Sequence, residues 1–144
     1  MRVLIVEDEA IIALCIRLTL LEAGHEIMGP AARLDECLTL VEKTVPDLAL
    51  IDIGLEGSNS GIDVARVLRE RWRVMSIYVS AYETEACEHM DVALGCLSKP
   101  FATASLVGTV AVAEVLQRGA VPLRLPEGLR IFPEAQHHDG CEEA

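Results

Sequence analysis

Acidic residues close two short apolar runs of this sequence, and they are the first sign of a reactive site. Glu7 and Asp8 follow the run RVLIV (2–6), and Asp52 follows LALI (48–51). Runs of this length and composition are typical of strands that are buried on both faces. Because a buried carboxylate costs several kcal/mol unless it is paired, these positions predict a cation or hydrogen-bond donors nearby.

Two later apolar runs also end in polar residues. Ser80 follows MSIYV (75–79), and Lys99 follows GCLS (95–98). In a doubly wound sheet of parallel strands, ligands collect at the carboxyl ends of the strands. We therefore expect three acids, a hydroxyl and an ammonium group to face one pocket.

This combination of groups predicts phosphoryl transfer to Asp52. Crowded carboxylates repel one another unless a cation intervenes, and Mg²⁺ takes oxygen ligands while it retains waters. Mg²⁺ held by Asp8, Asp52 and a backbone carbonyl would offset the charge of an arriving phosphoryl group. Lys99 and Ser80 would each bind a phosphoryl oxygen, and Asp52 would be the nucleophile that forms an aspartyl phosphate.

Each of these residues also has an ordinary structural explanation when it is taken alone. Glu7 and Asp8 could cap a helix and favour its dipole, and Asp52 could be a turn residue at a strand end. Ser80 by itself carries little information, and a single lysine such as Lys99 is usually a solvated surface residue. The order of these residue types at successive strand ends is what favours a site.

The apolar runs alternate with longer periodic segments, which indicates strands that alternate with helices. We expect strands at 2–6, 25–29, 47–51, 75–79 and 95–98. We expect helices at about 9–23, 34–44, 61–72, 84–93 and 103–117. In the first helix the residues that recur at helical spacing are Ile11, Leu14, Cys15, Leu18 and Leu21. Five βα units imply an α/β fold, a doubly wound five-stranded parallel sheet with helices on both faces.

The chain divides into a main domain at 1–118 and a C-terminal tail at 119–144. The tail contains prolines and ends in a polar stretch, so we expect it to be partly packed and partly disordered. The fifth helix, ATASLVGTVAVAEVLQR, is apolar or small on nearly every side. Since a surface helix should present a polar face, we expect a partner, a second copy of the chain, or the tail to cover it.

Composition excludes some classes of function. The 144 residues carry a formal net charge of −11, with 12 Lys and Arg against 23 Asp and Glu. Direct binding to nucleic acid needs clustered basic residues, so it is not expected, and no apolar segment reaches membrane-spanning length. The five cysteines show no metal-ligand spacing, which fits buried thiols in a reducing compartment. We expect a cytoplasmic protein.

Four motifs resemble those of a known family. The segments LIVEDE, LALIDIGL, VSAY and LSKPFA are similar to the receiver domains of two-component response regulators, over residues 1 to about 117. The resemblance implies a flavodoxin-like (CheY-like) fold with sheet order 2-1-3-4-5. It also implies that Asp52 accepts a phosphoryl group from a phosphohistidine on a sensor histidine kinase or a histidine phosphotransfer protein.

The family's metal ligands map onto matching positions of this sequence. The resemblance implies that Asp8 and Asp52 bind Mg²⁺ directly and that Glu7 acts through water. Gly54 would supply the backbone carbonyl. In this family the protein catalyses only its own phosphorylation and dephosphorylation, so we do not expect an enzyme that acts on other substrates.

The switch residues match the family only in part. The resemblance makes Ser80 the switch hydroxyl and Lys99 the phosphate partner, with Pro100 after a peptide bond that is typically cis. Receivers usually carry an aromatic residue three positions before this lysine, where this sequence has Cys96. Tyr82 is a candidate substitute. The segment from 80 to 99 is short, which predicts a small or irregular fourth helix.

Three functions remain open from the sequence. The first is a stand-alone phosphoacceptor receiver in a two-component phosphorelay that signals through protein contacts, with a homodimer through the fifth helix as one such contact. The second is a phosphorylation-independent docking module (a pseudo-receiver), which Cys96 would allow. The third is a small-molecule Mg²⁺-dependent phosphatase, which typically needs a second aspartate where this chain has Gly54.

Overall fold

One sheet with helices on both faces forms the domain. The computed structural model describes residues 1–57, 59–81 and 83–133, and within these the sheet has six strands: β1 (Arg2–Val6), β2 (Glu26–Ala31), β3 (Leu48–Asp52), β4 (Ser76–Ser80), β5 (Gly95–Ser98) and β6 (Leu129–Ile131). Their order is β2-β1-β3-β4-β5-β6. The first five strands are parallel, and β6 pairs with β5 in the antiparallel direction. The predicted α/β fold and order 2-1-3-4-5 are confirmed, and the predicted number of five strands is one too few.

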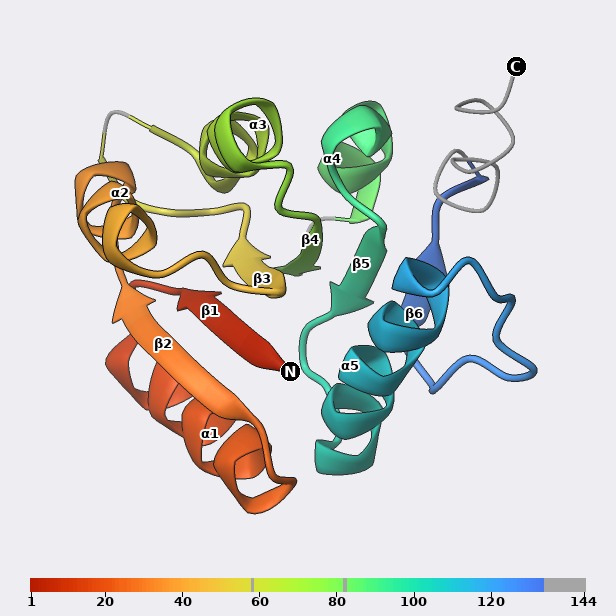
Figure 1. Cartoon of the computed structure of the whole chain (residues 1–144). Coiled ribbons are helices and arrows are strands. Elements are labelled where there is room, and N and C mark those ends of the chain that lie inside the picture. The colour runs from red at the N-terminus through yellow and green to blue at the C-terminus, as the bar shows by residue number, and fades with distance from the viewer. Residues whose placement is uncertain (58, 82, 134–144) are drawn as a thin grey trace.

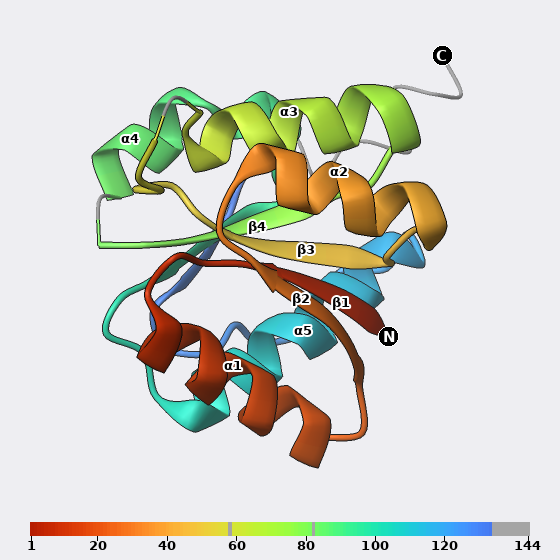
Figure 2. The ribbon, with the colours of Figure 1, turned by 90° about the vertical axis from the view of Figure 1, so that its left-hand side faces the viewer.

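The helices follow the strands in the predicted alternation. They are α1 (Ala10–Glu22), α2 (Leu34–Lys43), α3 (Gly61–Trp72), α4 (Glu83–Glu88) and α5 (Thr103–Gln117), with a short 3₁₀ helix at Met90–Val92. Helices α2, α3 and α4 cover one face of the sheet and α1 and α5 the other (Figures 1 and 2). The fourth helix is short, as its segment length predicted. In the part of the chain described, no helix is long and apolar enough to cross a membrane.

Strands β1 and β3 are buried on both faces, as their continuous apolar composition predicted. Every residue of β3 is buried, and Val3 to Val6 of β1 are at most 1% exposed. Alternate residues of each strand point to opposite faces, so β3 contributes Ala49 and Ile51 to the core under α2 and α3 and Leu48 and Leu50 to the core above α1 and α5. Strand β3 is thus packed between two cores, which hold its end, and Asp52 with it, in place.

Helix α1 forms where it was expected but presents a different face to the sheet. Ala13, Ile16 and Leu20 are buried, whereas the residues noted for their helical spacing lie on the solvent side: Ile11, Leu14, Cys15, Leu18 and Leu21. The helix is apolar on most sides, so its periodicity could not decide which stripe packs. The expectation of a buried thiol at Cys15 is therefore wrong, while Cys37 and Cys96 are buried.

The first half of the tail packs against the domain. Leu129, Ile131 and Phe132 are buried beside β5, whereas Val121, Leu123 and Leu125 are exposed. Pro126 lies against Gly108 of α5, where an added Cβ would come within 3.1 Å of the proline ring. The tail thus covers part of the apolar fifth helix. Residues 134–144 lie outside the described residues.

Candidate functional site

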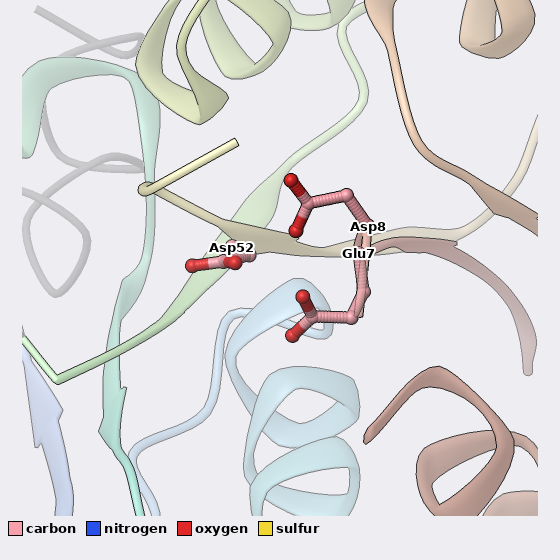
Figure 3. Close-up of side chains that lie close together, drawn as sticks. All are labelled: Glu7, Asp8 and Asp52. Atoms are coloured by element: carbon pink, nitrogen blue, oxygen red, sulfur yellow. The ribbon is translucent and has the colours of Figure 1, made fainter. Parts of the chain in front are cut away.

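The carboxyl ends of β1 and β3 bring three acids together. Glu7 and Asp8 follow β1, and Asp52 is the last residue of β3, its neighbour in the sheet. One carboxylate oxygen from each lies within 4.8 Å of the others, and Figure 3 shows the three carboxyl groups gathered on one side of the strand ends. Glu7 is 4% exposed and Asp52 8% exposed. The three acids therefore lie close together, as predicted.

Lys99 reaches the same place from the end of β5. Its Nζ donates to Oε1 of Glu7 at 2.7 Å and lies 3.4 Å from Oδ2 of Asp52. Burial opposes the charge of this ammonium, but the hydrogen bond from Lys99 to Glu7 and the nearby carboxylates outweigh burial and raise the pKa of Lys99. Lys99 is therefore not a solvated surface residue, and it stays charged against the acids. The peptide bond to Pro100 is cis.

The buried position of Glu7 changes the pKa of its carboxyl group. Burial raises its pKa from 4.5 to about 7; the hydrogen bond from Lys99 acts against this, and the neighbouring Asp52 adds to it. A carboxyl group with this pKa is only partly ionised near neutral pH. Even with Glu7 partly protonated, three carboxyl groups lie beside a single ammonium, and such crowding of carboxylates favours a bound cation.

The loop after β3 closes over the acids through backbone hydrogen bonds. The amide of Glu56 donates to Oδ2 of Asp8 at 2.8 Å, and the amide of Gly54 donates to Oδ1 of Asp52 at 3.0 Å. At the end of the loop, a Cβ on Gly61 would lie 2.0 Å from the carbonyl oxygen of Asp52. Only glycine lets α3 start this close to the strand end. No motif in the sequence pointed to Gly61 as part of the site.

The predicted switch positions lie along β4 and β5. Ser80 ends β4, is 1% exposed, and its carbonyl accepts from the amide of Lys99 at 3.0 Å. Cys96 lies within β5 and is 1% exposed, in the core under α3 and α4. Tyr82, the candidate substitute for the aromatic residue, lies outside the described residues.

Comparison with known proteins identifies the family. Residues 3–111 match the family model described as the response regulator receiver domain. The chain belongs to this receiver family. Its match covers the five parallel strands apart from Arg2 of β1, and most of α5, and it ends before β6.

Individual relatives support the same assignment. This receiver is 30% identical over 121 residues to the phyllosphere-induced regulator PhyR of Methylorubrum extorquens, covering 82% of this chain and 45% of that protein. It is 31% identical over 115 residues to the transcriptional regulatory protein PdtaR of Mycobacterium tuberculosis, covering 78% of this chain and 56% of that protein. The chain thus spans about half the length of the curated relatives it matches.

A solved structure agrees in fold. The solution structure of the receiver domain of the Erythrobacter litoralis PhyR response regulator superposes with a TM-score of 0.72 at 30% identity, over 78% of this chain and 88% of that one. The receiver fold is therefore shown by sequence and by structure.

The donor set of the acidic site suits Mg²⁺. All three converging side chains offer carboxylate oxygens, the ligands that hard divalent cations prefer, and the excess of acid over base favours a cation. Glu7, Asp8 and Asp52 are the residues that would hold the ion, which would supply positive charge beside Asp52. The amide of Glu56 already occupies one oxygen of Asp8.

Proposed function

We propose that this receiver is a phosphoacceptor in a two-component phosphorelay, which takes a phosphoryl group from a phosphohistidine onto Asp52 in a Mg²⁺-dependent reaction. The observation that carries the proposal is the placement of Lys99, 3.4 Å from Asp52 and between it and Glu7. A structural ion pair needs one acid and one base, whereas a phosphoryl acceptor needs a carboxylate flanked by cationic groups.

In the proposed step, the phosphoryl group moves from the donor histidine to Asp52. An Asp52 oxygen forms the new O–P bond while the P–N bond to the donor histidine breaks, and the departing imidazole nitrogen keeps the electron pair and takes a proton from water. Lys99 binds a phosphoryl oxygen throughout, and the hydroxyl of Ser80 binds another. Positioning and charge stabilisation do most of the catalytic work in such transfers. When Mg²⁺ is bound, Gly54 would offer it only a backbone carbonyl, and Glu7 would act through water.

Protein partners would then bind the phosphorylated and unphosphorylated forms with different affinity. A phosphoryl group adds roughly −1.5 to −2 charge beside Ser80 and the loop that Glu56 ties to Asp8. The proposed donor is a sensor histidine kinase or a histidine phosphotransfer protein. A cytoplasmic location, no direct contact with nucleic acid and no activity on other substrates belong to the same proposal, as composition and family led us to expect.

A homodimer through α5 is a further part of this proposal. Gly108, Ala111, Val112 and Val115 of α5 line an apolar pocket of about 590 Å³ together with the tail segment 121–126. Leu123 beside this pocket is fully exposed, so a second copy could bury it. Sedimentation that finds only monomer at high concentration, with and without phosphorylation, would refute the dimer.

The phosphoacceptor role is tested with acetyl phosphate and Mg²⁺, followed by intact mass. We expect the mass of one phosphoryl group to be added to the wild type and to Asp35→Asn, an exposed acid on α2, and not to Asp52→Asn. A gain that survives Asp52→Asn would refute the assignment of the acceptor.

The docking-module alternative rests on Cys96, a small buried residue where receivers usually have an aromatic one. It predicts that the protein neither binds Mg²⁺ nor is phosphorylated by acetyl phosphate. The phosphatase alternative is disfavoured because Gly54 offers no side chain for acid–base catalysis, and robust turnover of a small phosphoester would restore it.

A further inference from the structure

Strand β6 closes the sheet edge on the strand that leads to the site. Its residues Leu129 to Ile131 pair with β5, and hydrogen bonds hold both ends of this pairing. The amide of Phe132 donates to the carbonyl of Leu94 at 2.9 Å, and the amide of Ser98 donates to the carbonyl of Gly128 at 3.0 Å. Figure 1 shows β6 beside β5. The family match ends at residue 111, so this strand is an addition to the matched region.

Glycine allows this pairing to be close. A Cβ at Gly95 would lie 2.2 Å from the carbonyl oxygen of Arg130, a distance that no side chain permits. Gly128 has a φ of +85°, a conformation that favours glycine and turns the chain into β6. The sequence on both strands is thus suited to the β5–β6 contact.

Phe132 is the anchor of this strand. It is fully buried in the core under α3 and α4, the cluster that also contains Cys96. Its ring centroid is 6.3 Å from that of Tyr78 on β4, at an interplanar angle of 54°, which is within the range of favourable aromatic pairs. Phe132 therefore supplies an aromatic ring to the same core in which β5 itself offers only the small Cys96.

The end of β5 that presents Lys99 is held from both sides. On one side the amide of Lys99 donates to the carbonyl of Ser80 on β4, and on the other the amide of Ser98 donates to Gly128 ahead of β6. The ammonium beyond this anchored turn reaches Glu7 and Asp52. By contrast, the acids come from the ends of β1 and β3, neither of which pairs with β6.

We propose that Phe132 is a positioning residue for Lys99: its buried ring fixes β6 along β5, and Gly128, at the other end of β6, then holds the end of β5 that aims the ammonium at Asp52. The inference rests on the proposed phosphoacceptor function. It predicts that the rate of phosphoryl transfer falls without a fall in Mg²⁺ affinity, which a general loss of stability would not produce. Loosening β6 should slow phosphoryl transfer, which needs Lys99. It should not weaken Mg²⁺ binding, because the metal-binding acids lie on other strands and the ammonium competes with the ion for Glu7 and Asp52.

The test compares Phe132→Ala, Phe132→Leu and the control Leu18→Ala, which truncates an exposed leucine of α1 that has no part in the site or in the β5–β6 contact. The phosphorylation rate with acetyl phosphate is measured at saturating Mg²⁺, and Mg²⁺ affinity is measured by calorimetry. We expect Phe132→Ala to slow phosphorylation about tenfold, since small errors in positioning are costly. Phe132→Leu should recover part of the rate, and Leu18→Ala should keep the wild-type rate. Mg²⁺ affinity should fall in none of the three variants.

A double-mutant cycle with Lys99→Met shows whether Phe132 acts through the lysine. In the Lys99→Met background, Phe132→Ala should cause no further loss of rate. Full additivity, an unchanged rate in Phe132→Ala, or a parallel fall in Mg²⁺ affinity would each overturn the inference while the phosphoacceptor function stands. If Phe132→Ala does not fold, the same comparison is made with Phe132→Leu. A wild type that takes no phosphoryl group refutes the proposed function, and this inference with it.

Discussion

Glu7 offers a direct test of the electrostatics of the site. Its pKa is raised from 4.5 to about 7, first because the carboxyl group is buried. Between these two pH values the folded protein binds a proton on Glu7 that the unfolded chain has released. The stability that this proton contributes is therefore fully present below pH 4.5 and is lost as the pH rises through about 7. At about 1.4 kcal/mol per pH unit, the full loss is roughly 3 kcal/mol, in the absence of a divalent ion.

The variant Glu7→Gln removes this titration and keeps an oxygen that can accept from Lys99. We expect the free energy of unfolding of the variant, relative to the wild type, to rise by roughly 3 kcal/mol between about pH 5 and about pH 8. Urea unfolding in the presence of a chelator, at several pH values, measures this difference. Glu42→Gln, at an exposed position on α2, is the control and should follow the wild-type profile.

Parallel profiles for Glu7→Gln and the wild type would refute the electrostatic account. If the free energy of unfolding of Glu7→Gln, relative to the wild type, fell with rising pH, Glu7 would be stabilised as a carboxylate, with Lys99 as the dominant partner. Adding Mg²⁺ gives a second readout. At about pH 8, where Glu7 of the folded protein is mostly ionised, the ion should stabilise the wild type more than Glu7→Gln, because the variant lacks this carboxylate.

Three further predictions concern the site and the frame around it. Lys99→Met should lower the rate of phosphorylation of Asp52 about a hundredfold, the usual effect of losing one charge-stabilising donor; a rate near that of the wild type would exclude Lys99 from the transfer. Gly61→Ala should cost about 2 kcal/mol or more in urea unfolding, since the added Cβ would meet the Asp52 carbonyl at 2.0 Å, and an unchanged midpoint would contradict this close approach. In α1, Ile16→Ala should cost about 2 to 5 kcal/mol and the exposed Leu18→Ala within about 0.5 kcal/mol; equal costs would mean that the helix packs by another face.

The order of strands and helices could be predicted because periodicity is a local property. The apolar runs ending at Asp52 and Ser80 are continuous, as strands buried on both faces require, and the observed strands match them within a residue or two. The convergence of Glu7, Asp52 and Lys99 could be predicted as well, because parallel strands place their carboxyl ends at one edge.

Other features depended on packing that no local pattern encodes. The face of α1 was undetermined because Ile16 and Leu18 are equally apolar, and only contact with the sheet decides which of them is buried. The pairing of β6 with β5 was missed for a similar reason. Its three residues lie more than thirty positions from their partners, in a segment whose prolines suggested a tail.

The sequence by itself determined which chemical groups stand at the strand ends, since residue type and the alternation of strands and helices are written along the chain. Only the tertiary structure decided how these groups are paired. It placed the ammonium of Lys99 closer to Glu7 than to Asp52, and it buried Glu7 enough to raise its pKa. Distances and desolvation arise when strands far apart in sequence meet, so they follow from the packed sheet rather than from any segment of it.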